Sequence, residues 1–320
     1  MGTTDRLSAG DEWDAFWRDG ADAAVSGARG AVVAGLPDFW RRTLSEAPAL
    51  DGSALDLACG AGVVAREIRS IRQDADITVL DISPAAVRAA AGETRARGVV
   101  ASAASPPFRD GSFEVVVSQF GLEYAGLDAF DAAARLLAPG GLLAVVLHCA
   151  DGAIQRECRR NLEAARAVAD ADALSSVVEA FRIASGASGR TDLNAAMARN
   201  RRELATGAEA LKAARERFGE DAAGALARRV FDDIAKLFGN MRSYAVSDVE
   251  SWADGMRAQI DQYVARMAAM VGAALSKDDL QTAAELLRRR GALIADGSPA
   301  PLLDQGEPVA WTLVARKPLR

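Results

Sequence analysis

The sequence predicts an α/β fold in which a mostly parallel sheet of seven strands is covered by helices. Between residues 48 and 150, short apolar runs alternate with segments of helical spacing, which is typical of βαβ units. Beyond residue 151 the chain becomes rich in Ala, Arg and Glu, with helical spacing and no strand-like run. Residues 298–320 are again extended and suit a β-hairpin. We therefore expect one sheet domain interrupted by a large helical insertion.

Residues 1–47 are expected to form a helical arm ahead of the sheet. Apolar and aromatic side chains recur there at spacings of three and four, the period of an amphipathic helix. Three of the five Trp residues, Trp13, Trp17 and Trp40, lie in this arm. The spacing favours helices packed on the core, and closure of the arm over a ligand is the alternative.

Residues 48–150 are expected to hold five strands and three helices of the sheet domain. Strands are predicted near 53–58, 77–81, 99–101, 113–118 and 142–148, and helices near 63–71, 85–97 and 127–137. The sequence Ala138-Pro139-Gly140-Gly141 is expected to end the last helix in a turn, because Pro cannot donate a hydrogen bond and Gly turns readily.

The helical insertion is predicted to cover residues 151–297. Breaks that contain Gly or Asp, near 185–190, 219–224 and 239–248, divide it into several helices. Residues 302–305 and 308–316 are then expected to pair as strands and rejoin the sheet. The insertion suits a cap over one end of the sheet, and a homodimer interface is the alternative for its Ala-rich faces.

Composition and charge exclude several classes of function. The formal net charge is 38 − 44 = −6, so the field of the chain repels phosphate backbones and disfavours nucleic acid as a partner. The three cysteines, Cys59, Cys149 and Cys158, show no CxxC spacing, and neither a disulfide framework nor a metal site is expected. Neither a signal-peptide core nor a membrane-spanning apolar run is present, which favours a cytoplasmic protein with no membrane partner.

The strongest local signal is a turn of small residues, Asp56-Leu57-Ala58-Cys59-Gly60-Ala61-Gly62, between a predicted strand and a predicted helix. Small residues let a ligand approach the backbone, and the helix N-terminus offers free N–H groups to an anion. Nineteen residues after Gly62 the next strand ends at Asp81, whose carboxylate suits ribose hydroxyls. The pair favours an adenosine-type ligand over a plain tight turn followed by a helix cap.

Three further motifs follow this turn in order along the chain. They are Val79-Leu80-Asp81-Ile82-Ser83-Pro84, Pro107-Phe108-Arg109-Asp110-Gly111-Ser112-Phe113 and Arg135-Leu136-Leu137-Ala138-Pro139-Gly140-Gly141. Together with the turn they resemble the ordered motifs of the class I S-adenosylmethionine-dependent methyltransferases. The third glycine of a dinucleotide fingerprint is absent after Gly62, so a nicotinamide-dependent oxidoreductase is the weaker alternative.

The resemblance implies a Rossmann-like fold, S-adenosylmethionine as cofactor and methyl transfer as activity. The turn from Asp56 through Gly62 would wrap the methionine moiety, with Ala58 where the family has its first glycine. The remaining implied contacts are Asp81 at the ribose hydroxyls, Ile82 against the adenine, and Ser102, Ala103 or Ala104 at the adenine amino group, where the family often has an acid.

The ends of the predicted strands supply candidates for the transfer step. Ligands of open parallel sheets bind at the C-terminal strand ends, which places Gln119 and Phe120 near the cofactor's sulfonium. His148 is the single histidine and ends the strand near 142–148. Imidazole titrates near neutral pH and suits a general base, although a structural histidine fits this position equally. Glu123 and Tyr124 are candidates for substrate contact or else belong to a surface loop.

We therefore expect an S-adenosylmethionine-dependent methyltransferase that acts on oxygen or nitrogen of a small organic molecule or a peptide. The acidic balance, the absence of a nucleic-acid module and a cap that suits an enclosed pocket favour a small acceptor. The segment after the fourth strand lacks the Asn/Asp-Pro-Pro-Tyr/Phe sequence with which related enzymes hold base amino groups. A non-catalytic cofactor-binding or scaffold protein is the main alternative, because methyl transfer has no obligatory catalytic side chain.

Overall fold

The computed structural model describes residues 13–14, 16–18, 33, 35–47, 53–186, 192–219 and 222–319. The chain forms two compact units, one of residues 1–156 with 270–320 and one of residues 157–269. The second unit is shorter at both ends than the insertion expected at 151–297. Most of the expected arm, residues 1–47, lies outside the described residues; its described part includes helix α2 (Leu36–Ser45).

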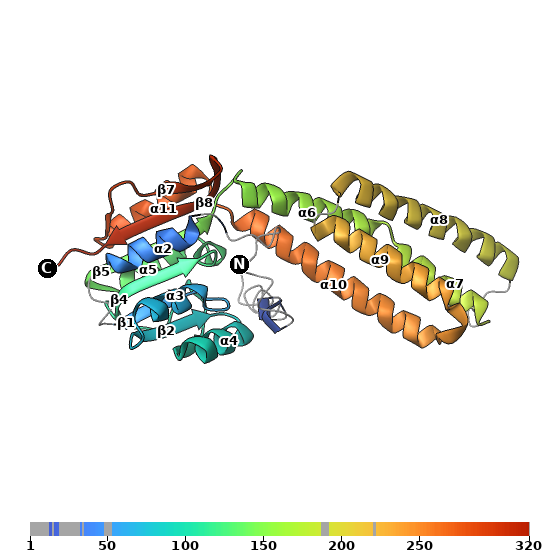
Figure 1. Cartoon of the computed structure of the whole chain (residues 1–320), viewed down its shortest axis with the longest axis horizontal. Helices are drawn as coiled ribbons and strands as arrows, with labels where there is room; N and C mark the ends of the chain where they lie inside the picture. Colours follow the sequence, from blue (N-terminus) through green and yellow to red (C-terminus); the bar gives the residue numbers. More distant parts are fainter. Residues whose placement is uncertain are drawn as a thin grey trace. The chain divides into compact units, whose positions relative to one another are not determined.

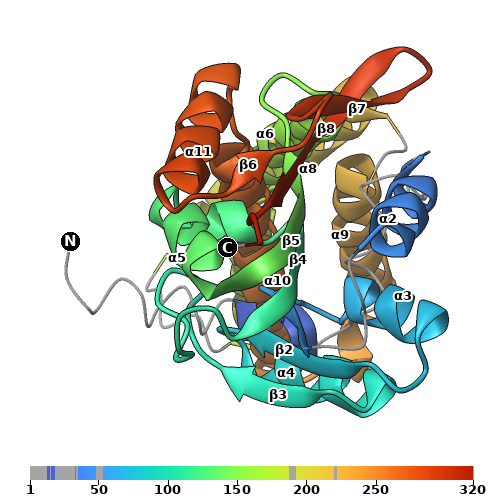
Figure 2. The ribbon, with the colours of Figure 1, turned by 90° about the vertical axis from the view of Figure 1, so that its left-hand side faces the viewer.

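An eight-stranded sheet forms the centre of the first unit (Figure 2). Its strands are β1 (Ser53–Leu57), β2 (Asp76–Asp81), β3 (Arg97–Val100), β4 (Phe113–Gln119), β5 (Leu137–His148), β6 (Leu293–Ile294), β7 (Ala300–Asp304) and β8 (Glu307–Arg316). Their order is β3-β2-β1-β4-β5-β8-β6, with β7 paired to β8. Strands β1 to β5 pair in parallel, whereas β8 runs antiparallel to β5. The predicted Rossmann-like α/β fold is confirmed, and the short β6 is the strand that the sequence did not indicate.

Helices cover both faces of this sheet (Figure 2). They are α2, α3 (Val63–Ile71), α4 (Pro84–Thr94), α5 (Asp128–Leu136) and α11 (Lys277–Arg289). Side chains of α5 and α11 share one buried apolar cluster with the sheet, including Phe130 and Leu287. Trp40 and Ile68, from α2 and α3, belong to the cluster on the other side. Helix α11, which the sequence analysis included in the insertion, is therefore a covering helix of the sheet.

Strand β5 begins earlier than its sequence indicates. Residues 138–141, expected as a turn, fall within β5, but Gly140 has a left-handed φ of +81° and the pairing of β4 with β5 shifts register between Phe113 and Val115. The preceding helix does end before them, at Leu136. From Gly141 to His148 every residue of β5 is buried, as expected for a strand covered on both faces.

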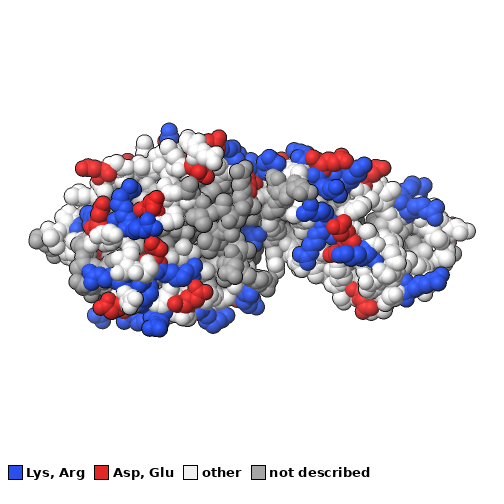
Figure 3. Space-filling model, viewed as in Figure 1, with Lys and Arg blue, Asp and Glu red and all other residues white. Residues whose placement is uncertain are grey.

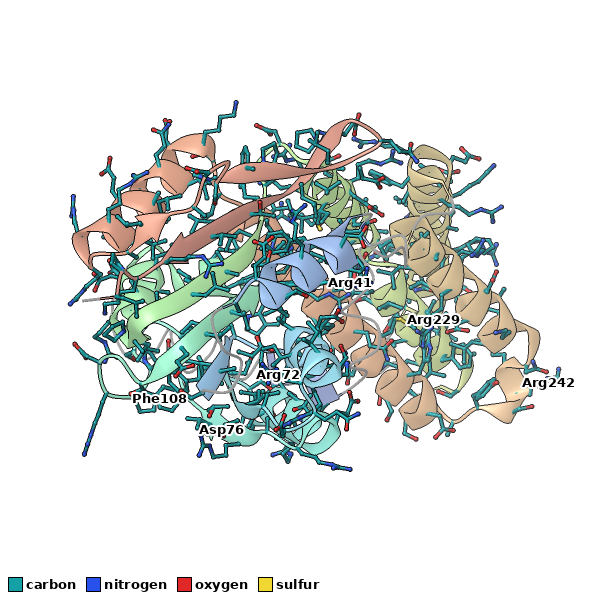
Figure 4. The ribbon with its side chains drawn as sticks, turned by 60° about the vertical axis from the view of Figure 1, so that its left-hand side comes forward. Arg41, Arg72, Asp76, Phe108, Arg229 and Arg242 are labelled. Carbon is teal, nitrogen blue, oxygen red and sulfur yellow. The ribbon has the colours of Figure 1, made fainter. Side chains whose placement is uncertain are left out.

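The N-terminal ends of the parallel strands lie at the edge of the sheet opposite to their carboxyl ends. Asp76, which opens β2, pairs with Arg97 at 2.8 Å on this side of the domain (Figure 4). Phe108, in the loop after β3, packs edge-on against Phe113 with ring centroids 4.9 Å apart.

The second unit is helical and has its own apolar core. Helices α6 (Ala153–Asp170), α7 (Ala173–Ala184), α8 (Leu193–Phe218), α9 (Ala222–Gly239) and α10 (Val246–Ala273) build it, and α6 and α10 continue into the first unit (Figure 1). Phe181, Leu211 and Ile260 belong to its buried cluster. Two of the expected breaks are found where α9 begins and ends. No helix among the described residues is both long and apolar enough to cross a bilayer.

Candidate functional site

The carboxyl ends of β1, β2, β4 and β5 meet at one edge of the sheet. Asp56 of β1 is paired with Val79 of β2 and with Val117 of β4, and Gln119 of β4 is paired with Val146 of β5. This register brings the loops after the four strands together, and these loops hold most of the predicted site residues. The site therefore lies where ligands bind in open parallel sheets.

The turn after β1 is built from left-handed backbone. The φ angle is +51° at Ala58, +50° at Gly60 and +75° at Gly62. A Cβ on Gly62 would lie 2.8 Å from the Cβ of Ala90 in α4, so the close packing of the turn on that helix requires glycine. Ala58 adopts the same type of backbone with a methyl group present, at the position where the resemblance expects glycine.

Cys59 lies in this turn with its side chain buried. Its N–H donates to the carbonyl of Leu80 at 3.0 Å, which ties the turn to the end of β2. Burial raises the pKa of the thiol well above its ordinary range. The thiol therefore stays protonated at neutral pH and acts as a small packing group.

Asp56 joins the turn to the helix that follows it. Its Oδ2 accepts a hydrogen bond of 3.0 Å from the N–H of Ala65 in α3. Burial raises the pKa of this carboxyl to about 8, although the bond from Ala65 opposes the shift, and the nearby charge of Asp81 raises it further. The turn thus carries an acidic group poised to ionise beside a cation.

Asp81 has the geometry that paired hydroxyl groups need. Its Oδ1 accepts from the N–H of Ser83 at 2.9 Å and its Oδ2 from the N–H of Gly60 at 3.0 Å. Burial raises the pKa of this carboxyl, because its residue is only 7% exposed. The N–H of Ile82 also donates to this carboxyl. A carboxylate accepts about four hydrogen bonds, so these three leave about one acceptor position for a ligand. The predicted ribose contact fits the residues present.

The loop after β3 lies beside Asp81, where the resemblance expects the adenine. The N–H of Ala101 donates to the Asp81 carbonyl at 3.0 Å. Ser102 Oγ accepts from the N–H of Ala104 at 3.3 Å, and Ala103 is buried. Ile82, the other predicted adenine contact, is half-buried at the end of β2. No acidic side chain stands among residues 101–104, so an adenine amino group bound there would donate to a carbonyl or to the Ser102 hydroxyl.

Residues of the N-terminal arm contact the site, and Asp14 is one that the sequence analysis did not single out. Asp14 Oδ1 accepts from the N–H of Ala85 at 2.8 Å and from Ser83 Oγ at 2.9 Å, at the N-terminus of α4. The bond from Ala85 is the main cause of a lowered Asp14 pKa. The indole of Trp17 lies against Gly60, where a Cβ would come within 2.6 Å of the ring. The described part of the arm therefore lies on the turn.

His148 and Glu123 form a buried pair at the ends of β5 and β4. The Nδ1 atom of His148 is 2.7 Å from Glu123 Oε1, and the backbone N–H of His148 donates to the same oxygen at 2.9 Å. The two side chains are 4% and 0% exposed. The sequence indicated both residues separately, but nothing in it indicated that they touch.

Aromatic side chains surround the imidazole of His148. The ring of Phe120 lies 4.6 Å away, and that of Tyr124 meets it edge-on at 5.7 Å. Trp13 of the arm packs edge-on against Tyr124 at 5.1 Å. Gln119, expected near the sulfonium, accepts a 2.6 Å hydrogen bond from the Trp40 indole through its Oε1. The surroundings of the His148 imidazole are therefore mostly apolar, apart from the carboxylate of Glu123.

Charges of both signs are interspersed on the face of the molecule seen in Figure 3, and no large basic area covers the part of it that is described. Among the described residues, no group of three or more His, Cys, Asp or Glu side chains is placed to hold a metal ion.

Comparison with known proteins identifies the sheet domain. Residues 55–145 match the family model described as a methyltransferase domain. No curated protein matches the chain. The matched residues 55–145 include the turn, Asp81, the loop after β3 and the segment from Gln119 to Tyr124. Residues 55–145 are thus similar to a methyltransferase domain.

Solved structures also resemble the chain over parts of their length. A methyltransferase in complex with the Haloferax volcanii Trm112 methyltransferase activator is 25% identical over 43% of this chain and 61% of that chain, with a TM-score of 0.36. Geranyl diphosphate C-methyltransferase from Streptomyces coelicolor A3(2) is 21% identical over 37% of this chain and 46% of that chain, with a TM-score of 0.33. An S-adenosylmethionine-dependent methyltransferase from Methanosarcina mazei is 25% identical over 38% and 63%, with a TM-score of 0.33. Each match spans less than two thirds of the other protein.

Proposed function

We propose that this methyltransferase transfers the methyl group of S-adenosylmethionine to an oxygen or nitrogen atom of a small organic molecule or a peptide, with His148 as the general base. The observation that carries the proposal is the position of the single histidine. Its imidazole stands at the end of β5, 2.7 Å from a buried carboxylate, at the sheet edge that also holds the turn and Asp81.

The residues of the turn and of β2 would hold the cofactor. Asp81 would accept from the ribose hydroxyls, and the small residues from Ala58 to Gly62 would contact the methionine moiety. Ile82 and the loop of residues 102–104 would contact the adenine. Two buried carboxyls, Asp56 and Asp81, lie at this edge, and burial raises the pKa of both.

The cofactor, when bound, supplies a methyl group already activated by a sulfonium sulfur. The chain's own residues align the acceptor, exclude water and take up the acceptor's proton. An oxygen or nitrogen acceptor carries a proton that must leave as its new bond forms, and the imidazole of His148 suits this task. The rings of Phe120 and Tyr124 beside it keep water from the imidazole and suit an acceptor with an apolar body.

The acidic balance of the chain supports a small acceptor rather than a nucleic acid. The net charge of −6 disfavours the phosphate contacts that supply most nucleic-acid affinity. Tyr124, whose ring meets the imidazole edge-on, stays a candidate for contact with the acceptor.

Calorimetric titration with S-adenosylmethionine, with a nicotinamide dinucleotide as comparison, tests the first half of the proposal. We expect micromolar binding of the former alone. Binding of neither ligand would overturn the proposal and favour the scaffold alternative.

Transfer of a labelled methyl group to a panel of hydroxyl and amine acceptors tests the second half. His148→Ala is expected to lower kcat by about a hundredfold to ten-thousandfold and to leave the affinity for S-adenosylmethionine unchanged. Asp76→Asn, at the opposite edge of the sheet, is the control and should match wild type in both. Wild-type turnover by His148→Ala would show that His148 is not the base.

A further inference from the structure

Glu123 lies inside the protein rather than at a surface where it would meet a substrate directly. It belongs to η2 (Leu122–Ala125), the short 3₁₀ helix after β4, and its side chain is 0% exposed. One carboxylate oxygen, Oε1, accepts both the backbone N–H and the Nδ1 of His148. The other oxygen, Oε2, is buried and has no hydrogen-bond partner among the described residues. Both hydrogen bonds to the carboxylate therefore come from the candidate base.

The backbone before Glu123 is held from three sides. Phe120 adopts a left-handed φ of +51° and donates its N–H to Val146 of β5 at 2.8 Å. Ser118 Oγ accepts from the N–H of Leu122 at 3.1 Å. A Cβ on Gly121 would lie 2.5 Å from the carbonyl oxygen of Ala58, so this segment packs directly on the cofactor turn. The carboxylate is thus delivered to His148 by a rigid segment and not by a mobile loop.

We propose that Glu123 is a positioning residue, which holds the imidazole of His148 in the tautomer protonated at Nδ1 and thereby leaves the lone pair of Nε2 free for the acceptor's proton. This inference rests on the proposed function. An ionised carboxylate only accepts hydrogen bonds, so the Nδ1 that faces it must donate. Nε2 lies on the opposite side of the five-membered ring and points away from Glu123.

The strength of the hydrogen bond between His148 Nδ1 and Glu123 Oε1 determines how strongly one imidazole tautomer is favoured over the other. A hydrogen bond to a charged partner favours the Nδ1–H tautomer by about tenfold to a hundredfold over the form that lacks it. Because Oε2 has no partner, no other donor among the described residues competes with His148 for this carboxylate. A protonated Glu123 would instead donate to Nδ1 and place the imidazole proton on Nε2, which is the opposite tautomer.

The same arrangement accounts for the proton during transfer. The O–H or N–H bond of the acceptor breaks, its electron pair stays on the acceptor atom, and the proton forms a bond with Nε2. The imidazole then carries a positive charge that faces the Glu123 carboxylate at 2.7 Å. The carboxylate orients the base and faces the charge that forms on it. The substrate class follows: an acceptor whose hydroxyl or amino group loses one proton on methylation.

The tautomer can be observed directly because the chain contains one histidine. Protein labelled with ¹⁵N-histidine and purified without a histidine tag gives a single pair of ring nitrogen signals. Their shifts and couplings in long-range ¹H–¹⁵N spectra show which nitrogen carries the proton. In the pH range where the ring is neutral, we expect Nδ1 to be the protonated nitrogen by at least about tenfold.

Two substitutions separate the acceptor oxygen from the rest of the side chain. Glu123→Gln keeps an acceptor at the Oε1 position, since the His148 N–H still requires one, and the Nδ1–H form should remain in the majority. Glu123→Met has similar length and no acceptor, and the preference should fall by at least about tenfold. Glu307→Gln, on the surface in β8, is the matched control and should leave the signals unchanged.

The outcomes are distinct from those of the proposed function. A wild-type imidazole protonated at Nε2 would overturn the inference, whether or not the variants fold, and so would an unchanged Nδ1–H preference in Glu123→Met. With an acceptor in hand, Glu123→Met should lower kcat and leave the affinity for S-adenosylmethionine unchanged, whereas Glu123→Gln should retain more of the rate. Failure to bind S-adenosylmethionine with the Nδ1–H tautomer intact would overturn the proposed function alone.

Discussion

The carboxyl of Asp56 provides the sharpest test of the electrostatics of the cofactor turn. It is buried, and burial raises its pKa from an ordinary 3.8 to about 8. The substitution Asp56→Asn removes the titrating group and keeps an oxygen that accepts from the N–H of Ala65, now bonded at 3.0 Å. We expect the variant to gain stability relative to wild type as the pH rises from 5 to 8.

The direction in which the free energy of unfolding changes with pH depends on whether the folded or the unfolded chain holds the proton of Asp56. Below the unfolded-state pKa the Asp56 carboxyl is protonated in both states, and its contribution to stability is fully present. Between that value and about 8, the unfolded chain releases the proton and the folded chain keeps it. Each pH unit then lowers the free energy of unfolding of wild type by about 1.4 kcal/mol. From pH 5 to 8 this amounts to about 4 kcal/mol, and the contribution is lost once the pH passes the folded-state pKa.

Urea unfolding at a series of pH values measures this difference. Trp252 is the single tryptophan of the second unit, so a Trp252→Phe background restricts the fluorescence signal to the sheet domain. Carboxyls that do not interact with Asp56 titrate alike in wild type and Asp56→Asn, and they cancel in the comparison. Asp76→Asn at the exposed pair with Arg97 is the control and should follow the wild-type slope. Parallel curves for Asp56→Asn and wild type would refute the reasoning, because they would mean that the folded protein holds Asp56 ionised.

Three further substitutions test the turn and the arm. Gly62→Ala places a Cβ 2.8 Å from that of Ala90 at a φ of +75°, and should lower the free energy of urea unfolding by about 1–3 kcal/mol; an unchanged midpoint would contradict this. Ala58→Gly removes the cost of a left-handed non-glycine residue, about 1–2 kcal/mol, but increases the entropy of the unfolded chain by about 0.5–1 kcal/mol. The free energy of unfolding should therefore stay the same or rise slightly, and a clear loss would count against strain at Ala58. Asp14→Asn should speed hydrogen exchange at the Ala85 amide, which donates to the Asp14 carboxylate. In wild type, acidification through the lowered pKa of Asp14 should also speed this exchange, whereas the variant should show no such additional effect.

Local sequence predicted the elements whose bounds depend on local groups. Helix α3 begins and ends where the sequence places it, at Val63 and Ile71, because Gly62 starts it and apolar spacing continues it. The sequence does not show that residues 138–141 belong to β5, because this depends on a bond from the Gly140 N–H to the carbonyl of Lys317 at 2.9 Å. That partner belongs to the C-terminal segment, and no local pattern at Gly140 shows that the two segments meet.

Helix α11 shows a second limit of local patterns. Its Ala- and Arg-rich composition is like that of the second unit, and spacing alone does not tell which core an amphipathic helix joins. In the structure its apolar face packs with α5, and Arg290 after its C-terminus binds both carboxylate oxygens of Asp131 at 2.6 Å. The β6 strand follows from this placement, since Leu293 and Ile294 then lie beside β8.

The candidate site likewise contains residues that local sequence indicates and residues whose positions depend on contacts distant in the chain. The glycine turn, Asp81 and His148 stand at strand ends, and alternating strands and helices are enough to predict that such ends gather at one edge. Asp14 reaches α4 across 71 residues of sequence, to Ala85, and no motif surrounds it. Glu123 was indicated only as a substrate contact, because its inward direction depends on a 3₁₀ turn that has no periodic signature.

Backbone contacts connect the cofactor turn to the base. Gly121 lies so close to Ala58 that a Cβ would meet both the carbonyl oxygen and the methyl group of that residue, at 2.5 and 2.7 Å. Two residues further along the chain, Glu123 binds His148 through both its backbone and its ring. A group held in the turn is therefore placed relative to the imidazole by closely packed main chain. Methyl transfer depends on alignment over a few tenths of an ångström, and rigid strand ends supply it better than flexible side chains. This explains why the two loops meet at a glycine.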